Sequence, residues 1–205
     1  MILDDLKTLR EHPPSVFGAE AHGFQMDPVL DEEDVVAFEE KYHVRLPEDF
    51  REFLTTIGNG GAEPFYQVFP LGMMDDNFGR REWKEEDGTV GVLREPFSFQ
   101  EEWNDVSGMP DFDLCDDAEY WRLHEKFTEK YWSGTLVNGA IPICHKGCAI
   151  RIWLVISGVQ AGFLWEDRRS EFAGLRPVTL STGKPATFSE WYGEWLTDCL
   201  REAEP

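Results

Sequence analysis

The sequence has few cysteines and no long apolar stretch, and each absence narrows the class of protein. Four cysteines among 205 residues are too few for the disulfide scaffold of a small secreted domain. No apolar run approaches the ~20 residues that a membrane-spanning helix needs. The chain begins Met-Ile-Leu-Asp-Asp-Leu, with acids where a secretory signal peptide has bases. The sequence therefore predicts a cytoplasmic protein that does not bind membranes.

Basic residues are also scarce, because 19 Lys and Arg stand against 40 Asp and Glu, a net charge of −21. This excess argues against non-specific binding to nucleic acid or to an anionic membrane. It is compatible with a strongly solvated surface or with a basic partner. Aromatic residues make up 14% of the chain, which a disordered acidic chain would lack. We therefore expect a folded chain of one domain, spanning residues 1–205.

Sequence motifs of catalysis are missing as well. No Gly-rich phosphate loop follows a strand, no Gly-x-Ser-x-Gly elbow occurs, and no His pair has metalloprotease spacing. Cys144, His145 and Cys148 form a short string, but zinc takes four ligands, usually in two paired clusters, and no second pair is present. We therefore predict no catalytic residue, metal or cofactor. A hydrolase that uses paired carboxylates is a third hypothesis, since forty acids give some pairs by chance.

The most informative stretch is residues 46–61, Leu-Pro-Glu-Asp-Phe-Arg-Glu-Phe-Leu-Thr-Thr-Ile-Gly-Asn-Gly-Gly. It predicts a short helix with Pro47 in its first turn and acids at its positive end. We expect Gly58 to close the helix in the left-handed conformation and residues 59–61 to turn the chain away. Apolar residues at helical spacing predict one buried stripe: Phe50, Phe53, Leu54 and Ile57.

Four other stretches show helical spacing. Residues 1–12 place Leu3, Leu6 and Leu9 on one side. Asp31 is a candidate N-cap for a helix to about Tyr42 that would form a hairpin with the next helix; its inner stripe is Val35, Phe38 and Tyr42. Residues 118–132 repeat apolar groups at Tyr120, Leu123, Phe127 and Tyr131. Thr187 can cap a last helix with an inner face of Phe188, Trp191, Tyr192, Trp195, Leu196, Cys199 and Leu200.

Strands are predicted mainly in the second half of the chain. Residues 64–72 read as a short strand between turns, and a strand block begins at Gly139. The near-continuous apolar run 148–156 is typical of a central strand, followed by a returning strand over 162–166. Arg151 lies within this run, so it needs an acidic partner or an opening to water. These elements predict a single α+β domain, with helices packed on a mostly antiparallel sheet.

The order of these pieces resembles the SUKH superfamily, the Smi/Knr-like domain. The resemblance rests on the helix over 31–43, on the 46–61 motif, on the strand at 64–72 and on later segments, which are Ile141-Pro-Ile, Gly147-Cys, Gly158, Gly162-Phe-Leu-Trp, Thr187-Phe-Ser-Glu-Trp and Trp195-Leu. It covers about residues 31–200. It implies the SUKH fold, with residues 73–139 as a variable acidic insertion.

The resemblance also implies a function. Bacterial SUKH proteins are mostly regarded as immunity proteins that bind and neutralise a toxin domain, often a nuclease, of polymorphic toxin systems. Fungal relatives are associated with regulation of cell-wall glucan synthesis. The family shares no catalytic motif, so no catalytic residue carries over. The resemblance thus implies a non-enzymatic immunity protein, with a regulatory or scaffold protein of the cell-wall type as the alternative.

The acids are clustered in one part of the chain. No Lys or Arg occurs from Glu95 through Trp121, and aromatics are interleaved with the acids there. Aromatic side chains anchor interfaces, and acids around them select a basic partner, such as the phosphate-binding cleft of a nuclease toxin. The charged flanks of Trp83 and Trp103 predict that both are exposed. The predicted partner-binding residues are Asp75, Asp76, Trp83, Glu85, Glu86, Asp87, Glu101, Glu102, Trp103, Asp105, Asp111, Asp113, Asp116 and Asp117.

Overall fold

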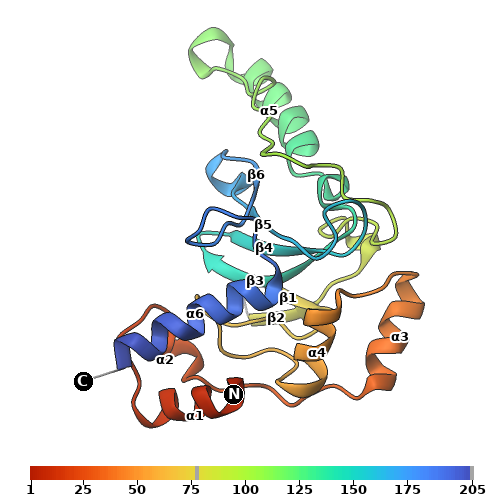
Figure 1. Ribbon diagram of the computed structural model, residues 1–205. Helices are drawn as coiled ribbons and strands as arrows, with labels where there is room; N and C mark the ends of the chain where they lie inside the picture. The colour runs from red at the N-terminus through yellow and green to blue at the C-terminus, as the bar shows by residue number, and fades with distance from the viewer. Residues whose placement is uncertain (77–78, 204–205) are drawn as a thin grey trace.

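A four-stranded antiparallel sheet lies at the centre of the computed structural model (Figure 1). The structure describes residues 1–76 and 79–203, with the side chain of Asp76 left out. The sheet contains β3 (Ala140–Gly147), β4 (Ile150–Val155), β5 (Leu164–Asp167) and β6 (Leu175–Pro177), which follow one another in chain order. A second, two-stranded antiparallel sheet of β1 (Met73–Asp76) and β2 (Gly79–Glu82) contacts β3 through β1.

Helices from both ends of the chain lie on one side of this sheet, and α5, from the middle of the chain, projects away from the other side (Figure 1). Their bounds are α1 (Ile2–Glu11), α2 (Ala19–His22), α3 (Glu32–Tyr42), α4 (Glu48–Thr56), α5 (Asp117–Tyr131) and α6 (Phe188–Ala203). Short 3-10 turns cover Glu85–Asp87, Phe112–Leu114, Gly134–Val137 and Arg169–Glu171. α6 packs on both α1 and α4. The helices and the antiparallel sheets confirm the predicted α+β domain.

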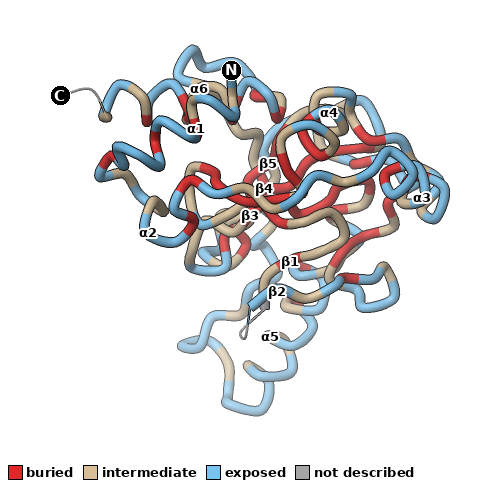
Figure 2. Tube along the Cα trace, turned by 90° about the horizontal axis from the view of Figure 1, so that it is seen from below, coloured by how far each residue is buried: buried red, intermediate tan, exposed pale blue. Residues whose placement is uncertain are grey.

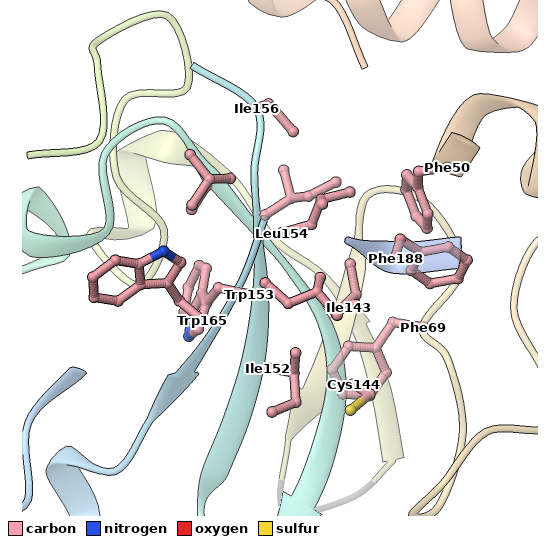
Figure 3. Packing of buried hydrophobic residues seen from close by; sticks show 14 of the residues in the cluster. Phe50, Phe69, Ile143, Cys144, Ile152, Trp153, Leu154, Ile156, Trp165 and Phe188 are labelled. Carbon is pink, nitrogen blue, oxygen red and sulfur yellow. The ribbon is translucent and has the colours of Figure 1, made fainter. Parts of the chain in front are cut away.

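The central strand β4 is apolar on both faces, as the run 148–156 predicts. Leu154 lies on the side of the strand that faces Phe50 of α4 and Phe188 of α6 (Figure 3), and Ile152, two residues before it, belongs to the same face. On the opposite face Trp153 lies directly across from Trp165 of β5, and Phe97 and Phe99 of the insertion pack against Trp165. Burial of such aromatic and aliphatic groups contributes roughly 1.5–3 kcal/mol for each side chain. Helices thus cover one face of the sheet, and the insertion covers the other.

The start of β4 differs from the prediction. Cys148 and Ala149 have φ angles of 50° and 58° and form the tight turn between β3 and β4, so the strand begins only at Ile150. The predicted partner of Arg151 is present, because its Nε and Nη2 donate to the two carboxylate oxygens of Asp75 at 2.8 and 2.9 Å. This bidentate pair ties the β1–β2 hairpin to the central sheet.

The 46–61 motif folds largely as predicted. Phe50, Phe53 and Leu54 of α4 are buried in the core, and Arg51 on the other side of the helix pairs with Glu32 and Glu39 of α3. The prediction for Gly58 is wrong, because the positive φ angles lie at Gly60 and Gly61, at 106° and 119°. Glycine is required at position 58 for steric reasons instead, since a Cβ there would lie 2.7 Å from the carbonyl oxygen of Asp27.

Three other predictions need correction. Residues 64–72 form no strand, because pairing is limited to single bridges from Val68 to Gly61 and to Cys144, and prolines at 64 and 70 cannot donate to a ladder. Leu6 and Leu9 are buried, but Leu3 is 48% exposed, because only the α6 side of α1 is covered. Residues 13–30 are rich in proline, glycine and small groups and so predict a loop, but they contain the short helix α2.

The last helix confirms its predicted cap and inner face. The Glu190 backbone amide donates to the Thr187 hydroxyl at 3.4 Å, and the Glu190 carboxylate accepts from the Thr187 backbone amide at 3.2 Å. This reciprocal pair is a capping box. The buried residues of α6 all belong to the predicted inner face: Phe188, Trp191, Tyr192, Leu196 and Cys199.

Candidate functional site

Residues 104–132 form an arm that extends from the end of the sheet. The arm consists of α5 and of the chain that leads up to it, and α5 projects away from the other helices (Figure 1). Asp116 begins the helix, because its side chain accepts from the Glu119 amide at 2.9 Å. Only the second half of α5 is packed, where Phe127 and Tyr131 are buried. The remainder of the arm is largely exposed (Figure 2).

A buried arginine fixes the base of the arm. Arg169 is 3% exposed, and its Nε and Nη2 donate to the Asp167 carboxylate at 2.9 and 2.6 Å. Its Nη1 donates to the carbonyl oxygens of Tyr131 and Ser133, both at 3.3 Å. The negative end of the α5 dipole also stabilises a cation at this position. The end of β5 is thus linked directly to the last turn of α5.

Tyr131 adds a second link at the same base. Its hydroxyl donates to Asn104 Oδ1 at 2.7 Å and accepts from the Gly174 amide at 3.0 Å. Trp103 stacks on the Tyr131 ring at 5.6 Å between centroids and exchanges two backbone hydrogen bonds with Leu175 of β6. Both chain ends of the arm are therefore held by the sheet, which gives its outer part a defined direction.

Exposed apolar side chains gather on the outer part of the arm. The exposed fractions are 58% for Phe112, 82% for Leu114 and 62% for Trp121. Phe112 packs edge-on against Tyr120, which connects the leading segment to the helix. The arm contains eight acids and three bases. It therefore combines apolar surface with an excess of negative charge of five.

The predicted site residues do not form one patch. Asp111, Asp113, Asp116 and Asp117 lie together on the outer arm and are exposed. Asp105 lies nearer the base, where a 2.7 Å pair with Lys130 and a hydrogen bond from Ser107 lower the pKa of its carboxyl to about 2. Glu101 and Glu102 precede the arm and are exposed. Asp75 is already paired with Arg151 in the fold.

The acids of the 85–87 turn lie on another side of the arm's base. Glu85 lines a hollow of about 510 Å³ together with Glu129 and Trp132 of the arm. Glu86 and Asp87 are exposed, and Asp87 pairs with Arg81 at 3.4 Å. For Asp76, the prediction concerns a side chain outside the described residues. The fold therefore brings the outer-arm acids together and separates Asp75 from them.

The predicted exposure of Trp83 is wrong. Its side chain is 1% exposed because it packs on the inner face of α3. The centre of its ring lies 6.1 Å from that of Phe38 and 5.5 Å from that of Tyr42. Trp103 is only half-buried, since it packs on Tyr131 and Phe99. It lines a groove of about 750 Å³ between the leading segment and α5. Trp83 is thus a core residue, and Trp103 supports the arm.

Sequence reasoning missed Trp121 and Leu114 as exposed groups. The signal for Trp121 was present, because the predicted stripe of Tyr120, Leu123, Phe127 and Tyr131 places position 121 outside the helix's inner face. Leu114 offered no such signal, since it lies in a short 3-10 turn whose packing depends on the fold of the arm.

A second set of buried polar groups lies away from the arm, between α2, β3 and α6. Glu63 is 0% exposed, and neither carboxyl oxygen has a hydrogen-bond partner among the described residues. Burial raises the pKa of Glu63 to about 8, although nearby backbone amides and the Cys144 thiol act in the opposite direction. Burial also lowers the pKa of His22 to about 4. Because Glu63 and Cys144 are closed to solvent, their position suits a role in the core rather than contact with a substrate.

Within residues 1–76 and 79–203, no group of three or more His, Cys, Asp or Glu side chains is placed to hold a metal ion. None of the helices in this part of the chain has the length and apolar character needed to cross a membrane.

Comparison with family models gives the decisive observation. The model of the SMI1 / KNR4 family (SUKH-1) matches residues 29–162, which is more than half of the chain. The chain belongs to the SMI1/KNR4 family. The match spans α3, α4, the arm and the sheet through β4, whereas β5, β6 and α6 lie beyond it. Searches of curated proteins and of solved structures found no match.

Membership in the SMI1/KNR4 family is consistent with the site. This family generally comprises non-catalytic immunity and regulatory domains, and its members commonly bind partner toxins. The SMI1/KNR4 domain described here presents an exposed arm with apolar and acidic groups, and its most perturbed carboxyl group is sealed in the core.

Proposed function

We propose that this chain is a non-enzymatic, cytoplasmic immunity protein whose arm binds and neutralises a basic, nuclease-type toxin domain. One observation carries the proposal: the arm holds exposed Phe112, Leu114 and Trp121 among eight acids. Exposed aromatics supply the anchors of an interface, and the acids select a positively charged surface. A nuclease presents such a surface because it must hold phosphates.

The charge of the arm gives an expected kinetic signature. Electrostatic steering raises association rates from about 10⁵–10⁶ to about 10⁸–10⁹ M⁻¹s⁻¹. The triple variant Asp113→Asn, Asp117→Asn and Glu125→Gln removes exposed acids that make no ion pair among the described residues. We expect it to bind the proposed toxin domain about ten-fold more slowly, with a weaker dependence on salt concentration. Stopped-flow or surface plasmon resonance measures both quantities.

A matched variant controls for total charge. Glu11→Gln, Glu40→Gln and Glu202→Gln remove the same charge from exposed sites on α1, α3 and α6, away from the arm (Figure 1). Equal effects of the two triple variants would reject the arm as the binding element. Co-expression of this chain with toxins encoded by neighbouring genes tests the immunity role. If the chain neutralised none of them, the immunity role would be rejected and the regulatory alternative favoured.

A further inference from the structure

One face of α5, continued by Trp132 directly after the helix, carries exposed side chains. Asp117, Trp121, Glu125 and Trp132 follow at steps of four or seven residues, which places them on neighbouring positions of one helical face. All four are exposed, with Trp121 at 62% and Trp132 at 39%. Large aromatic side chains on a solvent-facing helix surface point to an unfilled contact.

The base of this face shows which chemistry it accepts. The Arg169 guanidinium lies 5.3 Å from the centre of the Trp132 ring. The same guanidinium is held by the Asp167 carboxylate at 2.6 Å. A planar cation between an aromatic ring and a carboxylate is a favourable combination, because stacking and bidentate hydrogen bonding act on different sides of the guanidinium.

Trp121 likewise has acids at neighbouring positions of its helical face. It precedes Trp132 by eleven residues, roughly 16 Å along the helix axis. Within the described part of the chain, Lys or Arg groups lie over the rings of Tyr42, Phe65 and Trp132 only. Asp117 and Glu125 lie about one turn before and after Trp121, and neither forms an ion pair with a described residue.

The indole of Trp121 is also held in place. The rings of Tyr120 and His124 pack edge-on against it, with centroids 5.3 and 5.7 Å away. These contacts limit the rotamers of Trp121 and so reduce the entropy lost when a ligand binds. A purely apolar ligand would leave the carboxylates of Asp117 and Glu125 desolvated and without a partner.

We propose that Trp121, Asp117 and Glu125 form a seat for an arginine side chain of the protein partner. The inference deepens the proposed function, on which it rests for the partner's identity, by naming the group that the arm recognises. Arginine fits better than lysine because its flat guanidinium stacks on the indole while its N–H groups reach the carboxylates.

Peptide titration tests the seat without the toxin. The probe is a capped Gly-Arg-Gly-Gly-Arg-Gly peptide, followed through the indole N–H signals of the ¹⁵N-labelled full-length protein. We expect it to shift the Trp121 signal, which is assigned by its loss in Trp121→Ala. The Trp121→Ala variant should bind the peptide about two- to five-fold more weakly, the effect of one exposed cation–π contact. Lysine peptides should bind more weakly than arginine peptides, and citrulline peptides should not shift the signal.

Controls separate the seat from general attraction to an acidic protein. Val159→Ala removes a 72% exposed apolar group from the connection between β4 and β5, outside the arm, and should leave the affinity unchanged. An unshifted Trp121 signal, or equal affinities of Trp121→Ala and the wild type, would overturn the seat even if the charge variants confirm the arm. Conversely, a seat that binds arginine would stand if no toxin were neutralised.

Discussion

Replacing Arg169 with methionine is expected to lower the free energy of unfolding by about 3–5 kcal/mol, the usual cost of removing one partner of a buried ion pair. The variant leaves the Asp167 carboxylate, itself 3% exposed, without its guanidinium. It also removes the donor to the carbonyl oxygens of Tyr131 and Ser133. Urea denaturation followed by circular dichroism measures the loss.

The neighbouring arginine provides a matched control. Arg168 pairs with Glu171, but at 30% and 40% side-chain exposure, so Arg168→Met should cost no more than about 1 kcal/mol. Adding Asp167→Asn to Arg169→Met should recover part of the loss, because the unpaired charge is removed. If Arg168→Met and Arg169→Met were equally mild, Arg169 would not be the clamp of the arm.

Hydrogen exchange extends this prediction to the arm itself. In Arg169→Met, we expect the amides of the second half of α5 to exchange faster than those of β4, because the arm loses its link to β5 while the central sheet keeps its packing. Uniform acceleration across α5 and β4 would contradict a local role for Arg169.

Replacing Glu63 with glutamine is expected to change how stability depends on pH. The pKa of Glu63 is about 8 in the folded protein and about 4.3 in an unfolded chain. Between these values the folded state binds more protons, so stability falls as pH rises, by at most about 1.4 kcal/mol for each pH unit. The variant has no proton to lose and should not show this fall.

His22 determines the pH range in which the test is clean. Its pKa is about 4 when folded and about 6.5 when unfolded, so its contribution to stability rises with pH over that interval and opposes the effect of Glu63. Above pH 6.5 the opposing effect declines, because the imidazole is then mostly neutral in the unfolded chain as well. Burial raises the pKa values of the other facing groups, Cys144 and Tyr192, above their usual range, so they act only at higher pH.

The stabilities of the wild type and Glu63→Gln are therefore best compared between pH 6.5 and 8. Over this range we expect the stability of the wild type to fall by about 2 kcal/mol relative to Glu63→Gln. Exposed groups titrate in both proteins and cancel in the difference. Thermal or urea unfolding at four pH values gives the two curves, and parallel curves would show that Glu63 carries its charge in the folded protein at neutral pH.

The sequence predicted features that depend on short stretches. The stripe of α4, the cap at Thr187 and the central strand β4 follow from spacing over ten to sixteen residues. The position of Arg151 within an apolar run predicts an acidic partner or an opening to water, and the structure shows an acidic partner. The identity of the partner, Asp75, depends on where the β1–β2 hairpin docks, 76 residues away, and no local pattern contains it.

The arm illustrates the same limit at the candidate site. Helical spacing predicted α5, but its packing depends on Arg169 and Gly174, which follow it by about 40 residues. Trp83 was predicted to be exposed from its charged neighbours, yet Phe38 and Tyr42 cover it. Local charge describes the flanks of a residue, whereas burial depends on what the fold brings to its face.

The central claim is that the arm binds a basic toxin domain. Hydrogen exchange of this chain, alone and with the toxin domain that we propose it binds, tests it most directly. We expect slowed exchange within residues 108–125, centred on the first half of α5. Slowed exchange on α3 and α4 with an unchanged arm would contradict it.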